Sequence, residues 1–175
     1  KQIKQIENLV NEFSDFARMP KPILKDNDLV PLIKDNINLI NELDSNILIN
    51  FNTNRNNVIL NSDNEQLGRV FFNIIKNSIE SIQEKKSNNI DFKGQIDIIV
   101  NDNLSKIDFT IIDNGLGFRI FTDRVRDVLN PYFTTKKKGT GLGLAIVNKI
   151  INDHNGEINF IPVDDGAKIQ INFIK

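Results

Sequence analysis

The longest helical signal in the sequence is residues 63–84, which read DNEQLGRVFFNIIKNSIESIQE. Asn73 and Asn77 lie four residues apart in it, so both amides project from one side of the helix. The other side is strongly apolar, because large hydrophobic residues recur there at three- and four-residue spacing. They are Leu67, Val70, Phe71, Ile74, Ile75, Ile79 and Ile82. We therefore expect a long helix with one buried face and an amide pair on the other.

The amide pair suits one kind of ligand. An amide oxygen is a hard, neutral ligand for Mg²⁺, which keeps several waters and takes its remaining ligands from nucleotide phosphates. Taken alone, Asn73 and Asn77 are weak evidence, since two exposed polar residues are the more frequent explanation in a chain this rich in asparagine.

One helix and one strand are predicted before this segment. Asp28 can cap a helix that runs to about Leu43. The alternation of Ile47, Ile49 and Phe51 then predicts a strand. The apolar stripe of the helix consists of Leu29, Leu32, Ile33, Ile37 and Ile40.

Strands dominate the rest of the chain. Residues 95–101 and 106–113 alternate in hydrophobicity and predict an antiparallel pair. Residues 141–153 predict a helix, and residues 157–161 and 167–174 predict a closing hairpin around Asp164-Asp165-Gly166. This order predicts an α+β fold with antiparallel strands and helices on one face.

The N-terminal residues predict a different kind of helix. Ile3, Ile6, Val10, Phe13 and Ala17 have the spacing of a seam that packs against partner helices. The prolines at positions 20 and 22 end this helix, so we expect a stiff linker and a domain boundary there.

Composition excludes several classes of function. The 175 residues contain 22 basic and 23 acidic side chains, so no overall field attracts nucleic acid or an anionic membrane. Cysteine is absent, which excludes disulfides and thiolate chemistry. No apolar run approaches the roughly 20 residues that span a bilayer, so we expect a soluble, cytoplasmic chain.

Asp113-Asn114-Gly115-Leu116-Gly117 ends an apolar strand. A carboxylate here could accept a hydrogen bond from an exocyclic amine, while the glycines let a ring such as adenine approach the backbone. An ordinary Asn-Gly turn leaving a strand is the simpler explanation of these residues alone.

Residues 139–145, Gly139-Thr140-Gly141-Leu142-Gly143-Leu144-Ala145, follow three lysines and precede a helix. Glycines at a helix start let backbone N–H groups converge on an anion, which the helix dipole favours. A dinucleotide fingerprint is excluded, because a polar loop and not an apolar strand precedes the glycines. A P-loop is excluded, because no Gly-Lys-Ser or Gly-Lys-Thr follows them.

Taken in order, the asparagine helix, the Asp113–Gly117 strand end, the segment around Phe133 and the 139–143 glycine run resemble the N, first-glycine, F and second-glycine boxes of sensor histidine kinases. The resemblance covers residues 63–175 closely. Residues 15–22 are similar to nitrogen-regulation sensor kinases of the NtrY type.

The resemblance implies a specific architecture. It is the Bergerat ATP-binding fold, a two-layer α/β sandwich with a mixed, mainly antiparallel sheet. Residues 1–19 would be the end of a dimerisation and phosphotransfer helix, which is one part of a hairpin. Residues 20–27 would be the linker, and residues 28–175 the catalytic domain.

The resemblance also implies a role for each box. Asn77 would coordinate the Mg²⁺ that bridges the ATP phosphates, and Asn73 would support the same shell. Asp113 would bind the adenine amino group. Residues 116–139 would form a mobile ATP lid with Phe133 as its anchor. The other residues implied to bind ATP are Gly115, Gly117, Lys136, Gly139, Thr140, Gly141, Leu142 and Gly143.

Related gyrase, mismatch-repair and heat-shock chaperone ATPases activate water with a glutamate one helical turn before the magnesium asparagine. This chain has Asn73 there, which favours phosphoryl transfer to a side chain over rapid hydrolysis. Glu80 lies one turn beyond Asn77 and is a catalytic candidate for orienting the acceptor. A solvated helix charge explains Glu80 equally well.

Two departures from the family pattern stand out. Ala167 replaces a serine or threonine that in many relatives helps hold a water at the adenine. The acceptor histidine of the family lies upstream of the second hairpin helix, and the one histidine here, His154, is expected to be structural. We therefore expect the chain to bind ATP without autophosphorylation.

The sequence thus predicts the catalytic domain of a two-component sensor histidine kinase, using ATP and Mg²⁺. Expected partners are the acceptor-histidine helix of the same protein or its dimer mate and a response-regulator receiver domain. The full-length protein is expected to be a homodimer, and its tethering to a membrane is left open. Two alternatives stay open: a stand-alone serine kinase of the anti-sigma type, and a degenerate domain that binds helices but no nucleotide.

Overall fold

The computed structural model describes residues 10, 13–14, 16–43, 46–87, 91–117, 125–134, 139–161 and 163–175. Its elements are β1 Lys25–Asp28, α2 Leu29–Leu43, β2 Leu48–Thr53, β3 Ile59–Ser62, α3 Asn64–Ser87, β4 Gln95–Asp102, β5 Lys106–Asp113, η2 Val125–Leu129, α4 Gly143–Asp153, β6 Gly156–Ile161 and β7 Ala167–Ile174.

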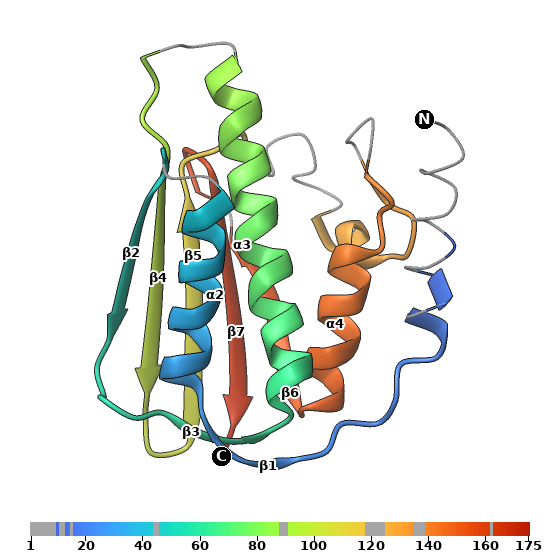
Figure 1. The fold of residues 1–175 in the computed structure, drawn as a ribbon. Coiled ribbons are helices and arrows are strands. Elements are labelled where there is room, and N and C mark those ends of the chain that lie inside the picture. The colour runs from blue at the N-terminus through green and yellow to red at the C-terminus, as the bar shows by residue number, and fades with distance from the viewer. Residues whose placement is uncertain are drawn as a thin grey trace.

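A five-stranded sheet with the order β2-β4-β5-β7-β6 is covered on one face by α2, α3 and α4 (Figure 1). The β2–β4 pair is parallel and the other neighbours are antiparallel. The predicted α+β sandwich with a mixed, mainly antiparallel sheet is therefore confirmed. None of the helices in the described residues is long and apolar enough to cross a membrane.

The core lies between α3 and the middle of the sheet. All seven apolar residues predicted for the buried face of α3 are buried. The rings of Phe71 on α3 and Phe109 on β5 have centroids 4.8 Å apart, and both side chains are almost fully excluded from solvent. This contact fixes α3 over the strand that ends at Asp113.

Part of the predicted linker belongs to the domain. Residues 25–28 form β1, which pairs antiparallel with β3. Side chains support the pairing: Asn61 donates to Asp26 Oδ1 at 2.9 Å, and Asn27 donates to the Ser62 carbonyl at 2.6 Å. The sequence Lys-Asp-Asn-Asp has no apolar alternation, so nothing in it predicts a strand.

The predicted helix tail is described only in part. Val10, Phe13, Ser14, Phe16 and Ala17 are helical, and the remaining positions before Phe16 lie outside the described residues. Phe16 packs against the core, and the Phe13 ring stacks on Tyr132 with centroids 6.4 Å apart.

Aspartates cap both long helices, as predicted for α2. Asp28 Oδ1 accepts the Val30 N–H at 3.0 Å, and Asp63 Oδ1 accepts the N–H groups of Glu65 and Gln66 at 3.1 Å. Burial opposes ionisation of Asp63, but the hydrogen bonds that its carboxylate accepts from the N–H groups of Ile23, Gln66 and Glu65 outweigh burial and lower its pKa. The pKa of Asp28 is also lowered, because three hydrogen bonds and Lys34 outweigh its burial.

Stability should therefore fall in acid. Both caps have a folded-state pKa below the unfolded value of about 3.9, so they stabilise the fold above that pH and lose their contribution as pH falls through the lowered pKa. We expect Asp63→Asn, which keeps an acceptor but cannot titrate, to flatten the acid limb in urea unfolding between about pH 2 and pH 6. Asp164→Asn, on an exposed turn, serves as the control, and an equal flattening in both variants would contradict the assignment.

Candidate active site

The candidate site lies where α3, the end of β5, the β6–β7 turn and the start of α4 meet. The β5 register brings Asp113 opposite Ala167, the first residue of β7. A Cβ placed on Gly115 would lie 2.4 Å from Ser81 Oγ on α3. One placed on Gly143 would lie 3.4 Å from Asn73 Oδ1. Three of the four predicted boxes are thus adjacent in space.

Asp113 is a buried carboxyl, 5% exposed. Its Oδ1 accepts the Gly115 N–H at 2.9 Å. Burial raises the pKa of Asp113, and hydrogen bonds from Gly115, Ser78 and the Ala167 backbone together with the charge of Lys85 partly offset that rise. A buried acceptor beside flexible glycines can recognise an amine on a flat ring.

Two turns interlock through glycines beside this carboxyl. Gly117 has φ +71°, and a Cβ there would lie 2.0 Å from the Gly166 carbonyl oxygen. Gly166 has φ +74°, and its Cβ would lie 1.7 Å from the Asp113 carbonyl oxygen. Only glycine fits either position, so the exit of β5 and the β6–β7 turn touch backbone to backbone. The Gly115-Leu116-Gly117 run therefore has a packing role at Gly117 as well as a predicted binding role.

The amide pair lies on α3 as predicted, and both amides are partly exposed. The Asn73 Nδ2 donates to the Arg69 carbonyl at 2.8 Å, which holds the amide against its own helix. Glu80 forms an exposed ion pair with Lys76 at 4.0 Å, one turn before it on the same helix. A pair this exposed contributes little to stability.

The second glycine run leads into α4. Gly141 has φ +71°, and a Cβ there would lie 2.5 Å from the Tyr132 carbonyl carbon. The Tyr132 N–H donates to the Gly141 carbonyl at 3.0 Å, and Tyr132 itself has φ 69°. The Leu142 side chain is fully buried in the core, so only its backbone could contact a phosphate. The bond between Tyr132 and Gly141 joins the segment before the glycine run to the start of α4.

The structure describes some of the remaining predicted residues and not others. Phe133 is partly buried, and its N–H donates to the Asn130 carbonyl at 3.2 Å. Thr140 Oγ1 accepts the Leu142 N–H at 3.4 Å, and Gly139 is exposed. Lys136 lies outside the described residues, as do residues 118–124 of the predicted lid.

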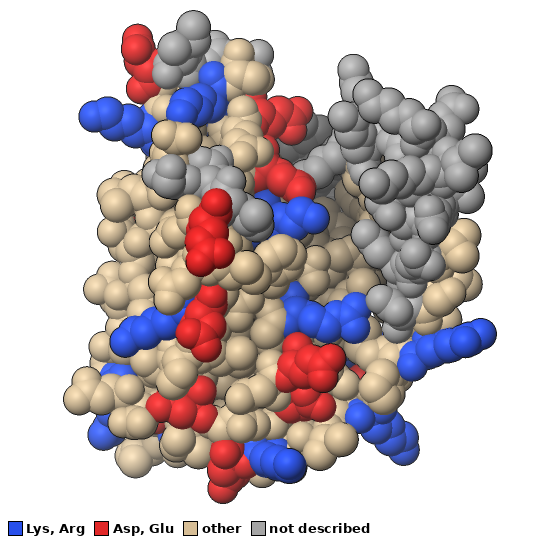
Figure 2. Space-filling model, viewed as in Figure 1, with Lys and Arg blue, Asp and Glu red and all other residues tan. Residues whose placement is uncertain are grey.

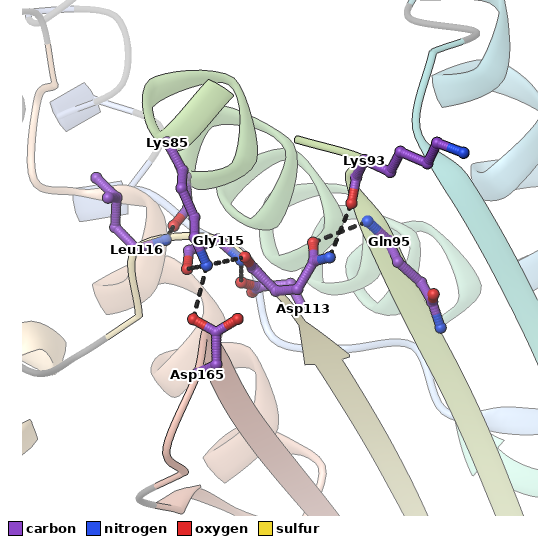
Figure 3. Close-up of polar contacts among 9 residues, drawn as sticks. Lys85, Lys93, Gln95, Asp113, Gly115, Leu116 and Asp165 are labelled. Atoms are coloured by element: carbon purple, nitrogen blue, oxygen red, sulfur yellow. Dashed lines mark hydrogen bonds and ion pairs between the residues drawn. The ribbon is translucent and has the colours of Figure 1, made fainter. Parts of the chain in front are cut away.

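Sequence reasoning missed three side chains of α3 that contact the Asp113 end of the site: Ser78, Ser81 and Lys85. The Leu116 N–H donates to Ser81 Oγ at 2.9 Å. Lys85 lies between Gly115 and Asp165, which belong to the two interlocked turns (Figure 3). The signal that could have found them is their spacing of three and four residues, which places all three on one side of the helix.

Charge on the helix face is mixed. Basic and acidic side chains are interspersed on the part of this face that Figure 2 colours by charge. The coloured part of this face therefore offers no broad basic patch, and the start of α4 is a local group that could bind the phosphates of a ligand.

The chain is similar to known proteins over most of its length. A family profile described as "Histidine kinase-, DNA gyrase B-, and HSP90-like ATPase" matches residues 62–175. Nitrogen regulation protein NtrY of Azorhizobium caulinodans is 35% identical over 175 residues, which is 98% of this chain and 22% of that protein. An NtrY-like sensor histidine kinase of Rickettsia prowazekii is 34% identical over 169 residues, which is 96% of this chain and 27% of that protein.

Solved structures share the fold. The catalytic domain of histidine kinase ThkA matches with a TM-score of 0.75 at 26% identity, covering 87% of this chain and 95% of that one. A complex of ThkA with the response regulator protein TrrA matches with a TM-score of 0.79 at 22% identity, over 99% of this chain and 48% of that one. This chain spans about a quarter of the length of the curated relatives named above.

Proposed function

Because this chain belongs to the histidine kinase-, DNA gyrase B- and HSP90-like ATPase family, as the ATP-binding catalytic domain of a sensor histidine kinase, we propose that it transfers the γ-phosphoryl group of ATP to a histidine outside residues 1–175. The phosphoryl group then passes to an aspartate of a response regulator. In this proposal residues 1–19 would be the end of the dimerisation and phosphotransfer helix. Of the predicted linker 20–27, only the part before β1 would connect that helix to the catalytic domain.

The state of His154 is the observation that carries this proposal. His154 is 4% exposed. Its Nε2 accepts the Asp63 N–H at 3.0 Å, and its Nδ1 lies 2.7 Å from the Ile150 carbonyl, to which it donates in the neutral ring. Both nitrogens that could accept a phosphoryl group are therefore engaged. The acceptor must come from another part of the protein or from a partner.

Asn77 and Asn73 fit a magnesium site that a nucleotide completes. In the described part of the chain, no three acidic or histidine side chains gather to hold a metal by themselves. The amide oxygen of Asn77 would be the protein ligand, and phosphate oxygens and waters would supply the rest. When bound, Mg²⁺ neutralises charge on the transferred phosphoryl group.

Asn73 supports transfer over hydrolysis. An amide cannot take a proton from water, and the Asn73 amide is also held by the Arg69 carbonyl at 2.8 Å. ATP bound beside it then awaits an acceptor that reaches the γ-phosphoryl group. Catalysis rests on positioning, with Asp113 holding the base and the start of α4 holding the phosphates.

The test uses this chain, ATP labelled at the γ-phosphate and a separate fragment that carries the upstream acceptor histidine. We expect acid-labile label on the fragment and none on this chain. Acid-stable label on serine would instead favour the anti-sigma type of kinase. Label on His154 would contradict the proposal.

A structural role for His154 makes a separate prediction. His154→Ala leaves the Asp63 N–H and the Ile150 carbonyl without their side-chain partner and opens a cavity between α3 and α4. We expect a loss of roughly 2–4 kcal/mol in the free energy of unfolding, measured in urea. ATP affinity should be near that of the unsubstituted chain at temperatures where the variant is folded. An unchanged unfolding free energy would show that the histidine is not structural.

A further inference from the structure

Lys85 has all three of its ammonium hydrogens directed to protein oxygens. Nζ donates to the Asn114 carbonyl at 2.7 Å, to the Gly115 carbonyl at 3.2 Å and to Asp165 Oδ1 at 2.6 Å (Figure 3). It also lies 4.7 Å from the centre of the Phe92 ring. An ammonium group has three donors, so its hydrogen-bonding capacity is filled.

These bonds connect three separate parts of the chain. Lys85 belongs to the last turn of α3, Asn114 and Gly115 to the exit of β5, and Asp165 to the β6–β7 turn. The Lys85 side chain is 24% exposed and that of Asp165 is 62% exposed, so water screens the ion pair, and the two backbone carbonyls are the more protected partners of the ammonium group. A solvated lysine would make no such set of bonds.

The contact reaches Asp113 through one peptide. The Gly115 N–H that Asp113 Oδ1 accepts and the Gly115 carbonyl that Lys85 holds belong to the same residue. Lys85 therefore holds Gly115, and Gly115 in turn orients the Asp113 carboxylate. Lys85 bonds to Gly115 on the β5 exit and to Asp165 on the β6–β7 turn. The contact between Gly117 and Gly166 joins the same two segments.

We propose that Lys85 is a positioning residue for recognition of the nucleotide base. It holds the β5 exit against the β6–β7 turn and so fixes the Asp113 carboxylate in the direction of the adenine amino group. This inference rests on the proposed function, because it assumes that Asp113 binds the base.

Electrostatics gives the proposal a second consequence. Burial raises the pKa of Asp113, and the positive charge of Lys85 lowers it. Base binding needs the carboxylate form, so affinity is lost as pH falls through that pKa. Among the described residues, Asp165 is the charged partner that Lys85 contacts, and its negative charge partly cancels that of Lys85.

The experiment measures the Kd of a non-hydrolysable ATP analogue with Mg²⁺ from about pH 4, near the ordinary carboxyl pKa, to about pH 8 for Lys85→Met, Lys85→Arg and Asp165→Asn. We expect Lys85→Met to weaken binding about tenfold at neutral pH and to move the acid loss of affinity to higher pH. Asp165→Asn should weaken binding less than Lys85→Met does. Its affinity should fall at the same pH as that of the unsubstituted chain or at a lower pH. Lys85→Arg keeps the charge with a different donor geometry, so it should lose affinity without moving the acid loss upward.

Lys86→Met is the matched control, since it removes the same charge from the neighbouring exposed position. Ionisation of the analogue is shared by all variants, so only differences from the unsubstituted chain are compared. If Lys85→Met does not fold, Lys85→Arg and Asp165→Asn still carry the test.

Two results would overturn the inference. In the first, the unsubstituted chain binds the analogue and Lys85→Met binds it equally well, which leaves the proposed function intact. In the second, Lys85→Met, Lys85→Arg and Asp165→Asn all shift the pH at which affinity falls in the same direction, as a general loss of structure would. If the unsubstituted chain binds no analogue, the proposed function fails, and this inference fails with it.

Discussion

Asp113→Asn should weaken ATP binding by at least about a hundredfold and at the same time make the domain more stable. The loss of binding follows because an amide can turn its NH₂ toward the adenine amine, so that a donor faces a donor. The gain in stability follows from burial, which raises the pKa of Asp113. A raised folded-state pKa means that the carboxyl stabilises the fold only at low pH, and that this contribution is lost as pH rises through the raised value. At neutral pH, asparagine avoids the cost of a buried charge.

The measurements are calorimetric titration with an ATP analogue and thermal unfolding at neutral pH. We expect the melting temperature to rise by roughly 2–4 °C. Asp108→Asn is the control, because Asp108 is buried to a similar degree on the same strand but faces the opposite side of the sheet. A variant that loses both affinity and stability would show that Asp113 is a structural residue.

Asn77→Ala should abolish phosphoryl transfer to the acceptor fragment, with a fall in rate of about a hundredfold or more. The substitution removes the one side chain proposed to hold Mg²⁺ and leaves the Asp113 end of the site intact. Binding of ATP should therefore lose its dependence on Mg²⁺, while binding of adenosine is unchanged. The readout is transfer of label in the presence of increasing Mg²⁺.

Asn52→Ala provides the matched amide control, since Asn52 is exposed on β2 and belongs to no part of the site. Equal rates for the Asn77→Ala chain and the unsubstituted chain would remove Asn77 from the metal site. A loss of adenosine binding would mean that the substitution disturbs the whole site.

The helices and the five-stranded sheet could be predicted because their side chains repeat with the period of the element. The stripe on α3 and the alternation of β4 and β5 each match the buried residues of the structure. The strands β1 and β3 could not be predicted in this way. These two strands pair through their backbones, and side-chain bonds between residues 35 positions apart, such as that from Asn61 to Asp26, support the pairing. Local periodicity carries no information about such long-range contacts.

The same difference applies to the site. Asp113 and the glycines were found because one short run of sequence contains both the carboxyl and the glycines that let a ring approach the backbone beside it. Lys85 was missed because its partner Asp165 lies 80 residues away along the chain. Its contacts depend on how α3 is placed over the sheet, which only the folded chain determines.

The contact between the two glycine turns also sets when the site can exist during synthesis. Gly166 touches the Asp113 backbone, and the Ala167 amide donates to the Asp113 carboxylate. A nascent chain that has left the ribosome only through α4 therefore lacks one wall of the base pocket. Nucleotide capture must wait until β7 has paired with β5, so retention on an immobilised ATP analogue would report that the last strand is in place.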